Sequence, residues 1–311
     1  MTNQETKLPA KYFDFVGKRK IFFSISLGLI IIGVIFFFAK GFNWDIDFIG
    51  GTTMQFHIGQ DLKSDNEARN NIASLVEEAT GVPVSSTQAT GSGFQDIVIK
   101  TLTLNTEQRD NAFNAVAQAY GLTENDRLSV ENVDPTVGKT LRNSAIAATS
   151  IAAILMLLYI TIRFELFSGI SAVCCLLHDI IIMLSFCCIL GLPMNTNVIA
   201  TILTILGYSI NASIINFDRV RENLKLNPKT PFEVNASAGV NQSLRRTAFT
   251  TITTLLTITT MYILGVTSVK DFALPIIIGI ASSLYSSLFI AAPLWYTLRE
   301  LLGKKKSKAK A

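Results

Sequence analysis

His178 and Asp179 are adjacent ionisable residues in the middle of a long apolar run of this 311-residue chain. Ionisable side chains within a membrane span are costly and need a partner or water. Successive helical residues point about 100° apart, so the two side chains lie on neighbouring faces of one helix. A proton relay and a hydrogen-bonded structural pair both remain open. We expect no metal site, because there is no second His-Asp pair and the only other histidine, His57, belongs to a different segment.

Arg246 stands near the start of a second apolar run, in which threonine recurs every three or four residues. On a helix this spacing places Arg246 at one end of a hydroxyl stripe. The stripe consists of Thr250, Thr253, Thr257 and Thr260. It indicates either a water-lined polar face or close helix packing by small hydroxyl residues. We name Arg246, Thr250 and Thr253 as candidates for a proton path, although Arg246 could equally extend its charge to the membrane surface.

A third polar stretch covers residues 207–223, where amide and hydroxyl side chains lie inside an apolar run and a charged turn follows. The inner group is Asn211, Ser213 and Asn216, and the turn carries Asp218, Arg219, Arg221 and Glu222. A helix that leaves lipid and enters a charged interface explains most of this pattern. Composition alone therefore assigns the stretch no function.

All four cysteines lie in one apolar run, as the pairs Cys174-Cys175 and Cys187-Cys188. At 1.5 Å per residue the pairs are about 20 Å apart along a helix, which is too far for one metal ion. Adjacent helical cysteines also point in divergent directions, which disfavours a disulfide within a pair. We therefore expect small packing residues, and no cofactor.

Six apolar runs must position these groups. The chain is 49% hydrophobic and only 16% charged, which is typical of a protein whose solvent is lipid. About twenty apolar residues in a helix cross the hydrocarbon core. The runs cover residues 21–39, 141–162, 167–190, 194–217, 247–266 and 272–298. The sequence therefore predicts a polytopic α-helical membrane protein with six transmembrane helices.

Lysine and arginine in the short loops set the orientation of such a protein. With the N-terminus inside, eighteen of these residues lie in cytoplasmic segments, and only Lys270 lies in a short outer loop. We therefore expect both termini in the cytoplasm. The segment 40–139 has seven more acidic than basic residues, so the basic excess elsewhere reflects topology and anionic lipid. Nucleic acid is not implied.

The segment between the first two runs alternates strand and helix patterns. Strands are expected at 52–58, 84–90, 95–102 and 127–133, and helices at 65–79 and 106–120. Asp65 and Thr106 are the expected N-caps, and Gly81 is expected to end the first helix. The order β-α-β-β-α-β is that of an α+β ferredoxin-like domain. Because it lacks a phosphate loop, a metal-ligand pattern and a Ser/His/Asp pattern, we expect this domain to bind rather than to catalyse.

The expected division of the chain follows. Residues 1–20 form a cytoplasmic N-terminus, 21–39 the first transmembrane helix and 40–140 the extracytoplasmic domain. Residues 141–298 form a five-helix transmembrane block, and 299–311 a basic cytoplasmic tail. No nucleophile or metal cluster gathers at one membrane depth, so we expect no enzyme.

Several motifs resemble the SecD/SecF family of protein-export membrane proteins, over nearly the whole chain. They are Asp45-Ile46-Asp47-Phe48-Ile49-Gly50-Gly51-Thr52, Val137-Gly138-Lys139-Thr140-Leu141, His178-Asp179, Gly207-Tyr208-Ser209-Ile210-Asn211, Phe217-Asp218-Arg219-Val220-Arg221-Glu222-Asn223, and Arg246-Thr247 with Thr253-Thr254-Leu255. Their agreement in order and spacing makes the resemblance specific. From these motifs the residues expected to have structural roles are Asp47, Gly50, Gly51, Gly138, Gly207, Asp218, Arg219 and Arg221.

The resemblance implies an auxiliary subunit of the bacterial Sec translocase in the plasma membrane, which uses the proton gradient in late steps of protein export. Six spans are half of a twelve-span unit, so SecD is the implied other half. Further implied partners are the SecYEG channel, translocating unfolded protein and membrane lipid, with YajC as another candidate. The alternative is a half-unit of a small-molecule or lipid exporter from the same resistance-nodulation-division superfamily.

The chain departs from the family pattern at Ala212. Many members have an aspartate there, which is a proposed part of the proton path. The resemblance therefore implies that SecD supplies the main acid, with Arg246 as a nearby cation and Asn211 as a hydrogen-bond partner. The departure argues against a proton-binding carboxylate in this half.

Overall fold

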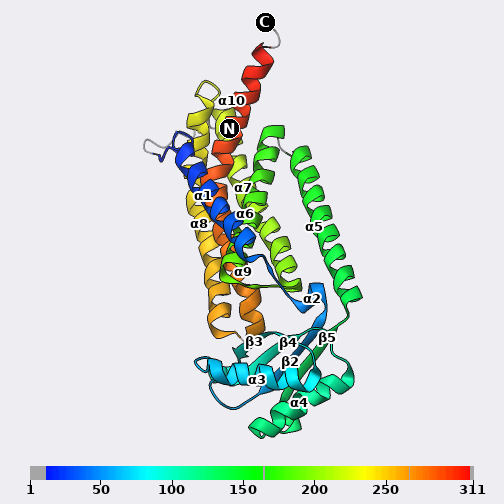
Figure 1. The fold of residues 1–311 in the computed structure, drawn as a ribbon. Coiled ribbons are helices and arrows are strands. Elements are labelled where there is room, and N and C mark those ends of the chain that lie inside the picture. The colour runs from blue at the N-terminus through cyan, green and yellow to red at the C-terminus, as the bar shows by residue number, and fades with distance from the viewer. Residues whose placement is uncertain (1–11, 164, 266, 309–311) are drawn as a thin grey trace.

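The computed structural model of the protein describes residues 12–163, 165–265 and 267–308 (Figure 1). Over these residues, six helical segments are long and apolar enough to cross a membrane. They are α1 (Arg19–Lys40), α5 (Pro135–Arg163), α6 (Leu166–Leu190), α7 (Thr196–Leu226), α8 (Phe232–Leu264), and the rod formed by α9 (Thr267–Ser286), a π-helical turn η3 (Ser287–Ala291) and α10 (Ala292–Lys308). The predicted class of a six-helix membrane protein is confirmed.

Helices α7 and α8 extend well beyond their apolar runs, at the end of the molecule remote from the sheet (Figure 1). Hydropathy marks only the part of a helix that lies in lipid, whereas these helices continue because they pack on one another. Gly239 allows the close approach, since a Cβ atom there would lie 2.8 Å from Cγ2 of Val220. Asn223 Nδ2 also donates to Gln242 Oε1 over 3.0 Å.

A four-stranded antiparallel sheet lies at the other end of the molecule (Figure 1). Its strands are β2 (Gly51–His57), β3 (Val84–Thr90), β4 (Asp96–Thr101) and β5 (Arg127–Val133), in the order β3-β4-β2-β5. Helices α3 (Asn66–Thr80) and α4 (Thr106–Tyr120) cover the face remote from the membrane helices. The core between them holds Met54, Phe56, Ile72, Val76, Ile97, Ile99, Phe113 and Val116. The other sheet face is thereby left toward the membrane helices.

The two helices of this domain begin at different kinds of N-terminal cap. Asp65 caps α3 as predicted, because its Oδ1 accepts from Ala68 N over 2.8 Å, and Gly81 ends that helix in the left-handed conformation. The predicted N-cap Thr106 is wrong. Asn105 caps α4, and it exchanges two hydrogen bonds with Gln108. This capping box satisfies two backbone donors at once, whereas a cap at Thr106 would have lacked the return bond.

The segment after α1 pairs with the segment before α7. Strand β1 (Asn43–Trp44) runs parallel to β6 (Pro193–Met194), which follows α6. Helices α1 and α6 therefore run in the same direction. The short helix α2 (Ile46–Ile49) then leads from β1 into the sheet.

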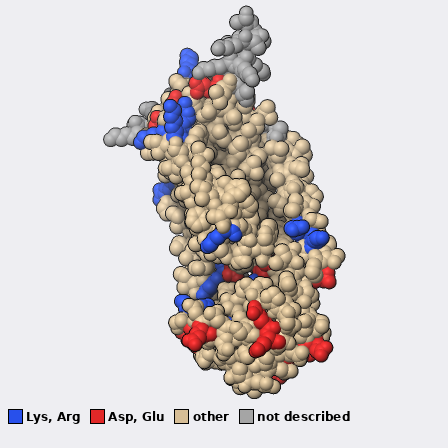
Figure 2. Space-filling view, viewed as in Figure 1, with Lys and Arg blue, Asp and Glu red and all other residues tan. Residues whose placement is uncertain are grey.

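Charge divides along the long axis of the molecule. Figure 2 shows acidic side chains gathered over the sheet-containing end, whereas uncharged side chains dominate the middle. This arrangement matches a domain in water joined to a block in lipid.

Candidate functional site

Asp179 is fully buried in the helix bundle, where it accepts hydrogen bonds from three serine hydroxyls and contacts the imidazole of His178. Ser209 Oγ of α7 lies 2.7 Å from Oδ2, and Ser286 Oγ of α9 lies 2.8 Å from the same oxygen. Ser282 Oγ of α9 lies 2.8 Å from Oδ1, and His178 Nδ1 lies 3.0 Å from it. One carboxylate on α6 therefore connects three helices.

Helical spacing explains how the serines reach Asp179. Residues four apart stand one above the other on a helix face, so Ser282 and Ser286 both point at the same carboxylate. Sequence reasoning named Ser209 within a motif but missed Ser282 and Ser286 as site residues. A pair of hydroxyl residues at i and i+4 in an apolar run is the pattern that could have identified them.

The π-helical turn η3 begins directly after Ser286 and is held by further polar side chains. A π-turn interrupts the regular hydrogen bonding of an α-helix. Asn216 Nδ2 of α7 donates to Ser287 O over 2.7 Å, and Ser171 Oγ of α6 donates to Ala291 O over 2.6 Å. Ser243 Oγ of α8 donates to Asn216 Oδ1 over 2.5 Å. The polar contacts around Asp179 thus continue through η3 to α8.

The other predicted proton-path residues lie on the surface of this chain. Arg246, Asn211, Thr250 and Thr253 are exposed, whereas Asp179 is buried. The hydroxyls of Thr250 and Thr253 donate to carbonyls one turn earlier in α8, over 2.8 and 2.7 Å. The structure therefore divides the candidates into an inner pair, His178 and Asp179, and an exposed group.

A groove of about 530 Å³ is lined in part by Thr253. It is bounded by α7, α8 and α9, and its lining residues are Thr204, Tyr208, Thr253, Thr254, Thr257, Ile258, Met261, Phe272 and Ile276. Tyr208 Oη lies 3.3 Å from Thr254 Oγ1 across it. Of the four exposed candidates, Thr253 therefore lines a mixed apolar and hydroxyl surface.

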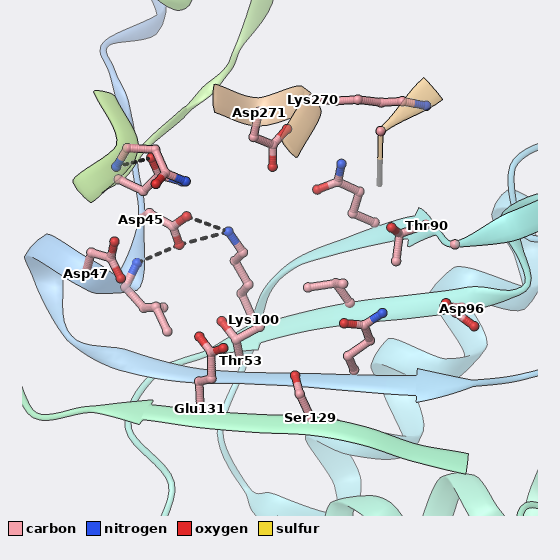
Figure 3. Close-up of a pocket in the computed structure, with 18 of the residues that line it drawn as sticks. Asp45, Asp47, Thr53, Thr90, Asp96, Lys100, Ser129, Glu131, Lys270 and Asp271 are labelled. Carbon is pink, nitrogen blue, oxygen red and sulfur yellow. Dashed lines mark hydrogen bonds and ion pairs between the residues drawn. The ribbon is translucent and has the colours of Figure 1, made fainter. Parts of the chain in front are cut away.

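A second cavity, of about 650 Å³, separates the open sheet face from the ends of the membrane helices nearest the sheet (Figure 3). Lys100 of β4 extends across it to Asp45, which precedes α2. Its Nζ lies 2.8 and 2.9 Å from the two carboxylate oxygens. Sequence reasoning missed this ion pair, because its members are separated by 55 residues and come from different elements.

Lys100 and Asp45 are expected to stabilise this junction by a coupling energy of about 1–3 kcal/mol, since each is largely buried and charge-assisted hydrogen bonds join them. A double-mutant cycle of Lys100→Met and Asp45→Asn in denaturant unfolding would measure it. Asn keeps the cap that Asp45 provides at Ile46 N. A coupling energy indistinguishable from zero would contradict the expectation.

Residues expected to be structural cluster at the same junction. Asp47 Oδ2 accepts from Thr196 N and Oγ1, over 2.9 and 2.8 Å, and so caps α7 from α2. Gly138 of α5 packs on α2, because a Cβ atom there would lie 3.1 Å from Gly50 N. Hydrogen bonds from the backbone and hydroxyl of Thr136 hold the pKa of Asp134, at the start of α5, below its usual value. Asp134 therefore remains an anionic helix cap at neutral pH.

The charged turn at the far end of α7 is partly paired. Arg219 Nε donates to Gln242 Oε1 over 2.7 Å, and its Nη1 lies 2.5 Å from Glu222 Oε2. Asp218 and Gly207 are exposed, and Arg221 is half-buried. Within the described residues, no group of three or more His, Cys, Asp or Glu side chains could hold a metal ion, and all four cysteines are free thiols.

Comparison with known proteins places this arrangement in a family. The family model of the protein export membrane proteins SecD and SecF, C-terminal, matches residues 113–301. The protein translocase subunit SecF of Dictyoglomus turgidum is 37% identical over 293 residues, which cover 94% of this chain and 99% of that one. The chain belongs to the SecF family.

Other SecF relatives are joined to SecD in one chain. The protein translocase subunit SecDF of Thermus thermophilus is 33% identical over 287 residues, which cover 91% of this chain and 38% of that one. The crystal structure of SecDF from that organism, described as a translocon-associated membrane protein, aligns with a TM-score of 0.83 at 32% identity. This alignment covers 94% of this chain and 39% of that one. Such fusions show that SecD is a partner of SecF.

Proposed function

We propose that this chain couples the proton gradient to late steps of protein export, as one half of a unit with SecD. The observation that carries the proposal is the match to SecF translocase subunits along nearly the full length of both chains. An auxiliary role in the Sec translocase follows from these relatives, and the exporter alternative is not favoured. Their transport role also speaks against an enzyme.

SecD is proposed to cover the exposed face that carries Arg246, Asn211, Thr250 and Thr253. Exposed polar groups at membrane depth need a partner or water. The groove beside the threonines offers both apolar and hydroxyl contacts for another helix. On this proposal an acid of SecD meets Arg246 and Asn211 at the interface.

The domain between α1 and α5 is proposed to be ferredoxin-like and to lie outside the cytoplasm, where it handles emerging protein. The strand order β3-β4-β2-β5 and the β-α-β-β-α-β sequence support this class. We propose that the chain divides into its cytoplasmic, membrane and extracytoplasmic parts after residues 20, 39, 140 and 298. Both termini then lie in the cytoplasm of a bacterium. SecYEG, YajC, unfolded substrate protein and lipid complete the proposed set of partners.

Arg246→Ala is expected to reduce gradient-dependent export at least fivefold, because coupling energies of about 1–3 kcal/mol correspond to factors of about 5–150. Export is measured in vesicles that contain SecYEG, the motor ATPase, SecD and this chain, with and without a proton gradient. Arg245→Ala is the matched control, since Arg245 is also exposed but stacks over the Phe249 ring at 5.6 Å. Undiminished export by Arg246→Ala would refute the proposed role.

A further inference from the structure

We propose that the His178–Asp179 pair is a proton-binding site within this chain, in which Nε2 of His178 takes up the proton and Asp179 is the fixed counter-charge. The inference rests on the proposed coupling function and deepens it. It places an ionisable group inside the half that lacks an aspartate at position 212.

Asp179 is surrounded by polar side chains. Three serine hydroxyls donate hydrogen bonds to its carboxylate, and Nδ1 of His178 lies 3.0 Å from Oδ1. The serine hydroxyls supply dipoles but no positive charge. A buried carboxylate without a cation is costly. The imidazole of His178 is the one contacting group that can become a cation.

No charged side chain of the packed helices competes for this role. Around the pair, α6 contributes the thiol of Cys175, and α9 contributes the phenol of Tyr285. The neighbouring helices have no Asp, Glu, Lys or Arg in their apolar parts. These parts are residues 21–39 of α1, 143–162 of α5, 197–217 of α7 and 272–298 of the rod from α9 to α10. Uptake of one proton therefore converts an isolated buried anion into a neutral ion pair.

The ring nitrogen Nε2 of His178 is the free position. Nδ1 is held by Asp179, whereas Nε2 is buried and has no hydrogen-bond partner. The side chain is only 10% exposed. Buried polar atoms in native proteins almost always have a partner, so an unpaired one calls for an explanation. A proton that adds here forms an imidazolium beside the carboxylate of Asp179.

Helix α1 packs on α6 and contributes a buried hydroxyl to the same region. Gly33 of α1 packs closely on Ser185 of α6. Ser26 of α1 is buried, and its hydroxyl interacts with the hydroxyl of Tyr285. The ring of Tyr285 in turn stacks on the imidazole of His178.

Tyr285 fixes the imidazole between the helices. Its ring stacks on that of His178 with the centroids 6.3 Å apart, and its hydroxyl donates to Phe22 O of α1 over 2.9 Å. Asp179 in turn connects His178 to Ser286, the last residue before the π-helical turn. Proton uptake therefore acts on the packing of α7 and α9 where the rod is interrupted.

The chain has only two histidines, which makes a direct test possible. The full chain with ¹⁵N-labelled histidine is placed in lipid bilayers, alone and with SecD, and its imidazole nitrogen NMR signals are followed from about pH 5 to about pH 9. We expect two titrating imidazoles. His178→Gln should remove one, and Asp179→Asn should prevent the imidazolium of His178 from forming in this range.

His57 provides the matched control, because its Nδ1 lies 2.6 Å from Asp96 Oδ1 in the domain outside the bundle. Asp96→Asn should alter only the His57 signal. A His178 that keeps one protonation state throughout, or that titrates equally in Asp179→Asn, overturns the proposal. Whether His178 changes its protonation state is measured on the unsubstituted chain, so this test holds even if a variant does not fold. Titration of His178 together with normal export by Arg246→Ala would refute the coupling role of Arg246 and leave this site standing.

Discussion

Replacing Asp179 by alanine is expected to lower the free energy of unfolding by about 3 kcal/mol or more, because each buried polar group left without a partner costs about 1–3 kcal/mol. Ser209, Ser282 and Ser286 would lose a common acceptor in the interior of the bundle. The measurement is unfolding of the purified chain in mixed micelles with increasing denaturing detergent, followed by circular dichroism.

Asp179→Asn serves as the conservative comparison, because the amide keeps the shape and one acceptor oxygen. We expect its free energy of unfolding to lie between those of the unsubstituted chain and of Asp179→Ala. Asp61→Ala controls for the loss of a carboxylate as such, since Asp61 is exposed and bonds only to Lys63 N of its own turn. If the free energy of unfolding of Asp179→Ala lies within about 1 kcal/mol of that of the unsubstituted chain, the hydrogen bonds from the three serines to Asp179 do not stabilise the bundle.

The six spans could be predicted because lipid imposes a length and a composition on every helix that crosses it. The strands of the sheet could be predicted for a related reason, since only one sheet face packs on helices. Ranges 84–90 and 127–133 agree with β3 and β5, and the other two strands differ by one residue at each end. These properties are local in sequence.

The network around Asp179 could not be predicted, since Ser282 and Ser286 lie 103 and 107 residues away from it. Their contact depends on the rotation of α6 and α9 about their axes, which hydropathy does not define. The expectation drawn from Ala212 stays a prediction. It concerns one position of α7, whereas the buried carboxylate Asp179 is on α6 and accepts a hydrogen bond from Ser209 of α7.

Replacing Gly50 by alanine is expected to destabilise the junction between α2 and α5 for two reasons. Its φ of +80° strains a residue with a side chain, at about 1–3 kcal/mol. A Cβ atom would also lie 2.6 Å from Pro135 Cα, and overpacking of this kind adds about 1–3 kcal/mol. Denaturant unfolding of the full chain measures the sum.

Gly59→Ala separates the two effects. Gly59 has the same φ of +80°, but a Cβ atom there would meet no other atom within 4 Å. The difference between the two variants therefore includes the close approach of Pro135, and we expect about 1–3 kcal/mol. Equal losses of unfolding free energy in the two variants would mean that backbone conformation alone requires Gly50. A larger loss at Gly50 would make the contact between α2 and α5 the reason that glycine stands in this motif.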